Sequence, residues 1–81
     1  MEDLPRYTLS KDPATRGWKL VDDETREVVM RFPTKEHATT TGALEKAVGL
    51  AGGSVTIEKA SGLWDEKRVY PRVVDRFRWN D

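Results

Sequence analysis

The chain has 81 residues, a length that suits one small domain, and we treat residues 1–81 as a single domain. It contains no cysteine and one histidine, which excludes a disulfide framework and a zinc site built from cysteine or histidine ligands. The 14 basic and 14 acidic side chains balance, which argues against a generally basic nucleic-acid binder but allows a local basic patch.

The sequence also lacks the marks of membrane insertion and secretion. No stretch approaches the ~20 consecutive apolar residues that a membrane-spanning helix needs. The first residues, MEDLPRYTL, are acidic and have no apolar core of a secretory signal. We therefore expect a cytoplasmic protein.

Alternation of polar and apolar residues predicts strands in the first half of the chain. Residues 6–12 predict a first strand or an extended lead-in, and residues 17–32 predict a hairpin with a polar turn, VDDETRE, between its arms. The apolar positions of these segments are Tyr7, Leu9, Trp18, Leu20, Val28, Met30 and Phe32. The opposite face is polar, so we expect a sheet with one apolar side and one wet side.

Residues 35–51 predict one helix, better ordered in its second half. Thr34 is a plausible N-cap, and Glu36 lies in the first turn, where the helix dipole favours negative charge. Gly42 weakens the first half, because glycine costs roughly 1 kcal/mol relative to alanine inside a helix. The apolar face of the predicted helix consists of Leu44, Ala47, Val48 and Ala51.

Gly52-Gly53 is the only glycine pair in the chain, and it raises the question of a phosphate-binding loop. In such a loop the glycines follow a strand and precede a helix, so that the phosphate meets the helix N-terminus. Here the predicted helix comes first and a strand follows. The pair is therefore predicted to end the helix as a left-handed cap.

A closing hairpin is predicted for residues 54–71. Val55 and Ile57 point to one face, residues 60–62 form a tight turn, and Pro71 ends the returning strand because proline cannot donate to a ladder. The predicted fold is α+β: a small antiparallel sheet in ββαββ order with one helix packed on one face.

Several short motifs lie along residues 16–71. They are a tryptophan in the first hairpin, FPTK with an alanine three residues later, GGSVTI, GLW and YP, at Trp18, Phe32–Lys35 with Ala38, Gly52–Ile57, Gly62–Trp64 and Tyr70-Pro71. This set resembles a family of small uncharacterised bacterial domains, of the kind called domain of unknown function 2188. The resemblance implies a ββαββ fold and carries no enzymatic residues. The chain departs from the family in TTTGAL and in its long apolar tail.

Two clusters of polar residues are candidate sites of chemistry. His37 lies beside Glu36, but adjacent helical residues do not face each other, so a structural histidine is favoured over a catalytic one. Asp22, Asp23 and Glu24 lack the glycine and the distal glutamate of a calcium loop, which favours a solvated turn over a metal site. We therefore expect no enzyme activity, cofactor, metal or small-molecule substrate.

The segment from Lys67 to Arg78 is the most distinctive charge feature, with five basic residues, one acidic residue and a net charge of +4. Interleaved arginine and aromatic residues are typical of protein interfaces and also suit phosphates and bases. The plainer interpretation is that the basic stems cover the edge of a small core. The candidate partner-binding residues are Arg68, Tyr70, Arg72, Arg76, Phe77, Arg78 and Trp79.

From this segment we predict an interaction module. Residues 72–81 are its C-terminal interaction tail, and its partner is another protein or a second copy of the chain. The alternative is a nucleic-acid-binding accessory protein, of the kind carried by a phage or plasmid.

Overall fold

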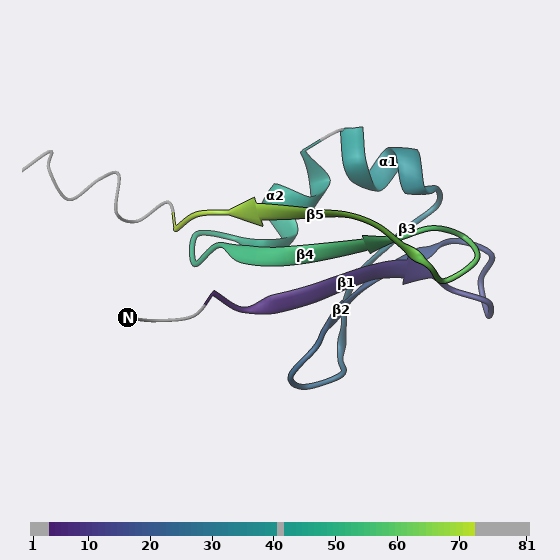
Figure 1. Cartoon of the computed structure of the whole chain (residues 1–81), viewed down its shortest axis with the longest axis horizontal. Coiled ribbons are helices and arrows are strands. Elements are labelled where there is room, and N and C mark those ends of the chain that lie inside the picture. The colour runs from purple at the N-terminus through teal and green to yellow at the C-terminus, as the bar shows by residue number, and fades with distance from the viewer. Residues whose placement is uncertain (1–3, 41, 73–81) are drawn as a thin grey trace, which may run out of the picture.

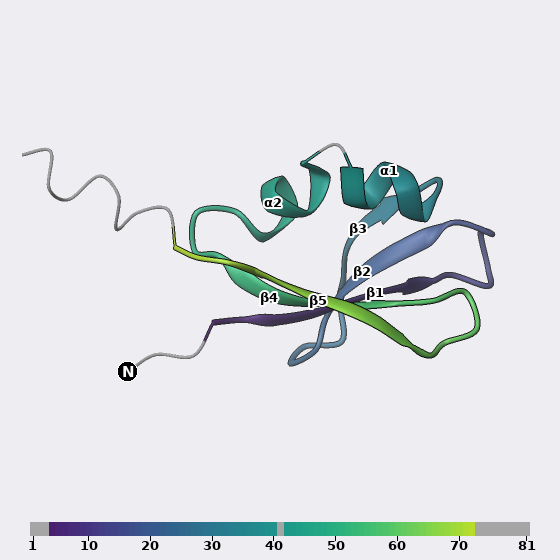
Figure 2. The same cartoon turned by 45° about the horizontal axis from the view of Figure 1, so that its top comes forward.

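The computed structural model describes residues 4–40 and 42–72, and it shows an α+β domain with a five-stranded sheet in the order β3-β2-β1-β4-β5. Two short helices lie on one face of this sheet (Figures 1 and 2). Within the described residues, no helix is long and apolar enough to cross a membrane. The elements are β1 (Arg6–Lys11), β2 (Trp18–Asp22), β3 (Val28–Phe32), α1 (Lys35–Thr40), α2 (Ala43–Val48), β4 (Gly53–Glu58) and β5 (Trp64–Tyr70).

The topology corrects the predicted ββαββ order and the predicted antiparallel sheet. Three strands precede the helices, and the sheet is mixed, because β1 pairs antiparallel with β2 but parallel with β4. Residues 6–12, predicted as a first strand or an extended lead-in, contain β1, which is the central strand of the sheet. A parallel neighbour needs a crossover connection, and α1 and α2 supply it between β3 and β4.

Leu9 on β1 is the centre of the core. It lies opposite Leu20 of β2 on one side and Ile57 of β4 on the other, and all three side chains are fully buried. The predicted alternation is confirmed here, since Trp18 and Val55 are buried on the same face. The helices add Ala38, Leu44 and Val48 to this core.

The same alternation is wrong for most of β3. Phe32 is buried, but Val28 and Met30 are each 39% exposed, and Val29 is also exposed. The pairing shifts between Leu20 and Val21, so that Val28 rather than Val29 lies opposite Val21. This bulge breaks the period of two. Among the described strands, β3 lies at the edge of the sheet and pairs only with β2.

The single helix predicted for residues 35–51 is instead two helices. Gly42 has a left-handed backbone, with φ at 74°, which interrupts an α-helix. Before it, the hydroxyls of Thr39 and Thr40 donate hydrogen bonds to backbone carbonyls one turn earlier. The predicted N-cap is confirmed, because Thr34 Oγ1 accepts the His37 N–H at 3.0 Å.

Gly52-Gly53 does not cap a helix, which corrects the predicted role of the pair. Helix α2 ends at Val48, and Gly49 is its cap. Gly52 has a φ of 75°, and a Cβ there would collide with the Tyr70 carbonyl oxygen at the end of β5. A Cβ on Gly53 would lie 2.6 Å from the Tyr7 ring. The pair is therefore needed where β4 begins close to β1 and β5, and a strand rather than a helix follows Gly52.

A buried aspartate organises the turn after β1. Asp12 is 4% exposed, and its carboxylate accepts the Ala14 N–H at 3.0 Å and Arg31 Nη1 at 2.6 Å. The hydrogen bond from Ala14 is the main cause that lowers the pKa of Asp12, and Thr15, Lys19 and Arg31 act in the same direction. Through Arg31 this carboxylate also joins β3 to the β1–β2 turn.

The close approach at Gly52 predicts a large cost for a single added methyl group. We expect Gly52→Ala to lower the free energy of unfolding by about 3 kcal/mol, from backbone strain and steric overlap together. Gly62→Ala is the matched control, because Gly62 also has a positive φ but nothing lies within 4 Å of its added Cβ. We expect it to cost about 1–2 kcal/mol. Urea denaturation measures both, and equal losses would contradict the close packing at Gly52.

The lowered pKa of Asp12 predicts a pH-dependent stability. Its folded pKa lies below the ordinary value of 3.8, so the unfolded chain binds more protons in that range and stability falls as the pH drops below about 4. We expect Asp12→Asn to destabilise the domain at pH 7 and to differ progressively less from the parent between pH 4 and pH 2. Thermal unfolding at several pH values tests this, and a pH-independent difference would contradict it.

Candidate functional site

Strand β5 lies at one edge of the sheet. It pairs antiparallel with β4 from Gly53↔Tyr70 to Glu58↔Trp64, and in the described part of the chain it has a neighbour on this side only. An edge strand presents one row of backbone N–H and C=O groups that a further strand can pair with. With seven residues, β5 is the longest strand described and offers the longest such row (Figure 1).

A β-bulge sorts the side chains of β5 between the two faces of the sheet. Ile57 lies opposite Glu66 and Glu58 lies opposite Trp64, so Asp65 is the extra residue. On the helix side, Asp65 forms an ion pair with Lys35 of α1 at 2.5 Å. The hydrogen bond from Lys35 is the main cause that lowers the pKa of Asp65.

Arg68, a predicted partner-binding residue, is occupied within its own domain. Its Nη1 donates to the Thr39 carbonyl at the end of α1 at 2.8 Å, and its Nε donates to Glu66 Oε2 at 2.8 Å. The hydrogen bond to Glu66 is the main cause that raises the pKa of Arg68, and Tyr70 adds to it. Arg68 therefore holds β5 to the helix layer.

The other predicted partner-binding residues divide into two groups. Tyr70 is half-buried and packs against the core, and Arg72 is half-buried just after β5. Residues Arg76, Phe77, Arg78 and Trp79, and with them most of the predicted 72–81 tail, lie outside the described residues. The structure thus brings Arg68 and Tyr70 together on the helix side of β5.

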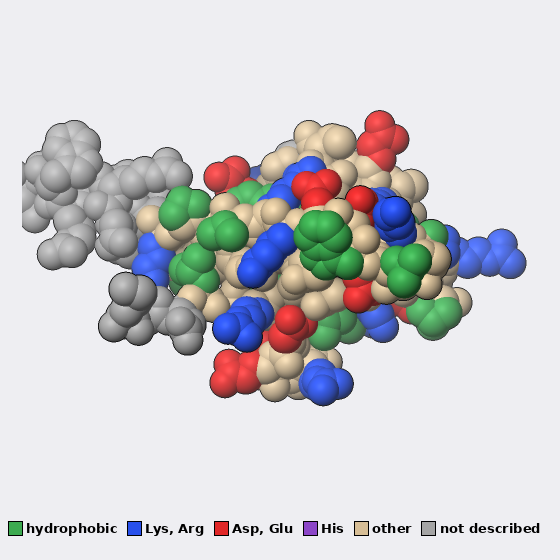
Figure 3. Space-filling model, in the orientation of Figure 1, with side chains coloured by type: hydrophobic (Ala, Val, Ile, Leu, Met, Phe, Trp, Pro, Cys, Tyr) green, Lys and Arg blue, Asp and Glu red, His purple; other side chains and the backbone are tan. Residues whose placement is uncertain are grey.

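The open side of β5 carries exposed residues that the prediction missed. Trp64 is 64% exposed and Val69 is 59% exposed, with Lys67 exposed between them and Leu63 exposed just before the strand. We call Leu63, Trp64, Lys67 and Val69 the β5 edge. Figure 3 shows hydrophobic and basic side chains interspersed along the band where β5 runs. Strand alternation could have indicated Val69, because it separates Val69 from Tyr70, but the bulge that exposes Trp64 has no clear sequence mark.

The rest of the open face of the sheet is mostly polar, and Val21 and Val28, which lie opposite each other, depart from the prediction. Half-buried hydroxyl residues line its two central strands: Thr8, Ser10, Ser54 and Thr56. Basic residues from the other strands surround them, and one of these, Arg31, is paired with Asp12. Such a face is typical of a sheet that is solvated on one side.

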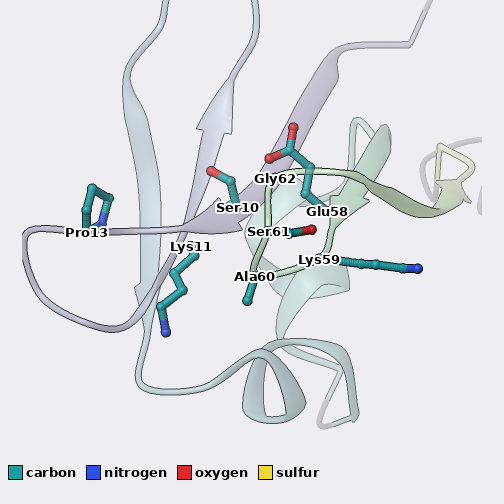
Figure 4. Close-up of a pocket in the computed structure, with 8 residues that line it drawn as sticks. All are labelled: Ser10, Lys11, Pro13, Glu58, Lys59, Ala60, Ser61 and Gly62. Carbon is teal, nitrogen blue, oxygen red and sulfur yellow. The ribbon is translucent and has the colours of Figure 1, made fainter.

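The surface hollows of the described residues offer little for a small molecule. One of about 400 Å³ lies between the end of β1 and the β4–β5 turn (Figure 4). Its two lysines, Lys11 and Lys59, run away from each other rather than toward a common point. Small-molecule sites instead gather a few polar groups in a concave apolar pocket.

The two candidate clusters, at His37 and at Asp22–Glu24, have structural contacts. Asp22 Oδ1 accepts the Glu24 and Thr25 N–H groups, and Asp23 Oδ1 accepts the Thr8 hydroxyl at 2.7 Å, so both stabilise the β2–β3 turn. The His37 ring lies 6.4 Å from the Phe32 ring. Among residues 4–40 and 42–72, no group of three histidine, aspartate or glutamate side chains could hold a metal ion.

Comparisons with protein-family models, with curated proteins and with solved structures find no match to this chain.

The contacts of Arg68 predict that it acts mainly on stability. We expect Arg68→Ala to lower the free energy of unfolding by about 1–2 kcal/mol, because it removes charge-assisted hydrogen bonds at a partly exposed site. Lys67→Ala, one residue away on the open face, is the control and should change stability by less than about 0.5 kcal/mol. Chemical denaturation of both variants measures the two losses of stability. Equal effects would show that Arg68 does not hold β5 to α1.

Proposed function

We propose that the chain is a non-enzymatic interaction module that binds a partner protein through the β5 edge. One observation carries this proposal: a seven-residue edge strand displays Trp64 and Val69, each more than half exposed, on either side of Lys67. A partner strand can add to such an edge through main-chain hydrogen bonds, while the side chains provide specificity.

The composition of the β5 edge supports a protein partner. Tryptophan is enriched among the residues that dominate binding energy at protein interfaces. The segment 72–81 directly follows β5 in sequence, and we include its Arg76, Phe77, Arg78 and Trp79 in the proposed surface. Together these residues extend one mixture of aromatic, aliphatic and arginine side chains from Trp64 onward.

Charge on β5 favours a protein over a nucleic acid. Asp65 and Glu66 balance Lys67 and Arg68, so the strand itself is neutral. A groove that follows a phosphate backbone needs an excess of basic residues, and its affinity falls steeply with salt. Nucleic-acid binding through Lys67 and the basic tail is therefore the second candidate.

We also propose kinship with the small bacterial domains of unknown function that the motifs resemble. Two of these motifs, Gly52-Gly53 and Tyr70-Pro71, are far apart in sequence but adjacent in space, since a Cβ on Gly52 would lie 2.9 Å from the Pro71 carbonyl carbon. This contact explains why the two motifs occur together: both are needed for the start of β4 to pack against the end of β5.

A capture experiment tests the protein-binding proposal. The tagged full chain is immobilised and exposed to nuclease-treated extract of its host cell, and bound proteins are quantified. We expect Trp64→Glu combined with Val69→Glu to reduce specific capture at least ten-fold, because two carboxylates replace the apolar contact residues. Circular dichroism confirms that the variant is folded.

The control uses the other edge of the sheet. Val29→Glu combined with Met30→Glu changes two exposed apolar residues of β3, and we expect it to leave capture unchanged. Capture that survives the β5 substitutions but is lost with the β3 substitutions would contradict the proposal. Capture from untreated extract that is absent from nuclease-treated extract would favour the nucleic-acid function.

A further inference from the structure

We infer that the partner of the β5 edge is a second copy of this chain, with the two β5 strands paired antiparallel around a two-fold axis at Lys67. This inference rests on the proposed function and identifies the partner that binds the β5 edge. It starts from the sequence of β5, in which Glu66 and Arg68 flank Lys67 with opposite charges, and apolar Trp64 and Val69 lie further out.

Symmetry decides which residues meet in such a pair. In a continuous antiparallel sheet the two-fold axis is perpendicular to the sheet, and opposed residues lie on the same face. An axis at Lys67 therefore places Glu66 opposite the second copy's Arg68, and Arg68 opposite the second copy's Glu66. Glu66 and Arg68 therefore each meet a residue of opposite charge, and only Lys67 meets its own kind.

The Glu66 and Arg68 side chains are suited to this exchange. They lie on the helix side of β5, 46% and 34% exposed, so each can be reached from outside the domain. Arg68 donates through Nε to Glu66 and through Nη1 to the Thr39 carbonyl, and it also interacts with the Tyr70 side chain. A guanidinium has five N–H donors in all, so donors remain for a second carboxylate. Two copies together would form a four-member network of alternating charge across the axis.

The open face contributes the apolar part of the interface. Because Asp65 is the bulged residue and turns to Lys35, Trp64 takes the open face at the end of the strand. Val69 of one copy then lies beside the second copy's Trp64, once on each side of the axis. The association therefore covers Trp64 and Val69, two of the three exposed apolar residues of the β5 edge; the third is Leu63.

The two neighbouring symmetric registers are less favourable. An axis at Glu66 opposes two carboxylates, and an axis at Arg68 opposes two guanidinium groups, both on the side crowded by α1. An axis at Lys67 also opposes like charges, but on the open face, where two long amines can diverge into water. Pairing of one strand lies at the small end of specific interfaces, below roughly 1,200 Å², so the expected dimer is weak.

Disulfide trapping tests the position of the axis, because the chain has no cysteine of its own. In Lys67→Cys the two thiols meet at the axis, where opposed Cα atoms of an antiparallel pair are ~4.5–5.5 Å apart, within the range for a disulfide. In a glutathione redox buffer we expect a covalent dimer that forms at least ten times faster than with Val29→Cys on the β3 edge. Equal rates, or faster trapping at Val29, would overturn the inference.

Sedimentation equilibrium of the full chain supplies a second measurement. Lys67→Thr removes the only like-charge contact of the pair, and we expect it to lower the dimer dissociation constant by roughly two- to five-fold. Lys19→Thr, on the open face of β2, is the control and should leave the constant unchanged. A monomeric parent chain at several hundred micromolar, together with no trapping at Lys67→Cys, would overturn the inference.

The outcomes separate this inference from the proposed function. If the chain is monomeric and untrapped but still captures a protein in a manner that depends on Trp64 and Val69, the second copy is wrong as occupant and the protein-binding proposal stands. If capture is insensitive to Trp64 and Val69, the proposed function itself is wrong. A dimer that the Trp64 and Val69 substitutions dissociate supports both.

Discussion

The fold depends on the burial of Leu9 between Leu20 and Ile57. This side chain makes β1 the central strand, with antiparallel β2 on one side and parallel β4 on the other. A parallel neighbour requires the chain to cross over the sheet, and α1 and α2 form that crossover while they cover the apolar face. Strand β5, the hairpin partner of β4, can then pair only with the side of β4 that faces away from β1. The exposed position of β5 is thus a consequence of the central strand.

An outer strand of a small domain has few apolar contacts to hold it. Tyr70 packs against the core, but the other helix-side residues of β5 are charged, and they secure the strand through Lys35 and the Thr39 carbonyl of α1. These contacts engage one face of β5 and leave Trp64 and Val69 on the other. One strand therefore combines a polar attachment to its own domain with an apolar outer surface, which suits recognition of another chain.

The sequence predicted what local physics determines, and it failed where two distant segments decide the outcome. Alternation located Leu20, Val55 and Ile57, and capping chemistry located Thr34, because each depends on near neighbours. The role of Gly52 depends on the approach of Tyr70, and the exposure of Trp64 depends on a bulge opposite β4. The arginine-and-aromatic signal overlaps the end of β5, yet Arg68 itself faces α1.

Hydrogen exchange of the β5 backbone amides, measured by NMR on the full chain, tests the central claim most directly. We expect alternate β5 amides, those directed away from β4, to exchange rapidly in dilute solution, while the amides bonded to β4 are protected. The rapidly exchanging set should become protected when the partner, including a second copy at high concentration, occupies the edge. Uniform protection of every β5 amide at all concentrations would show that the chain covers this edge itself, and would contradict the account.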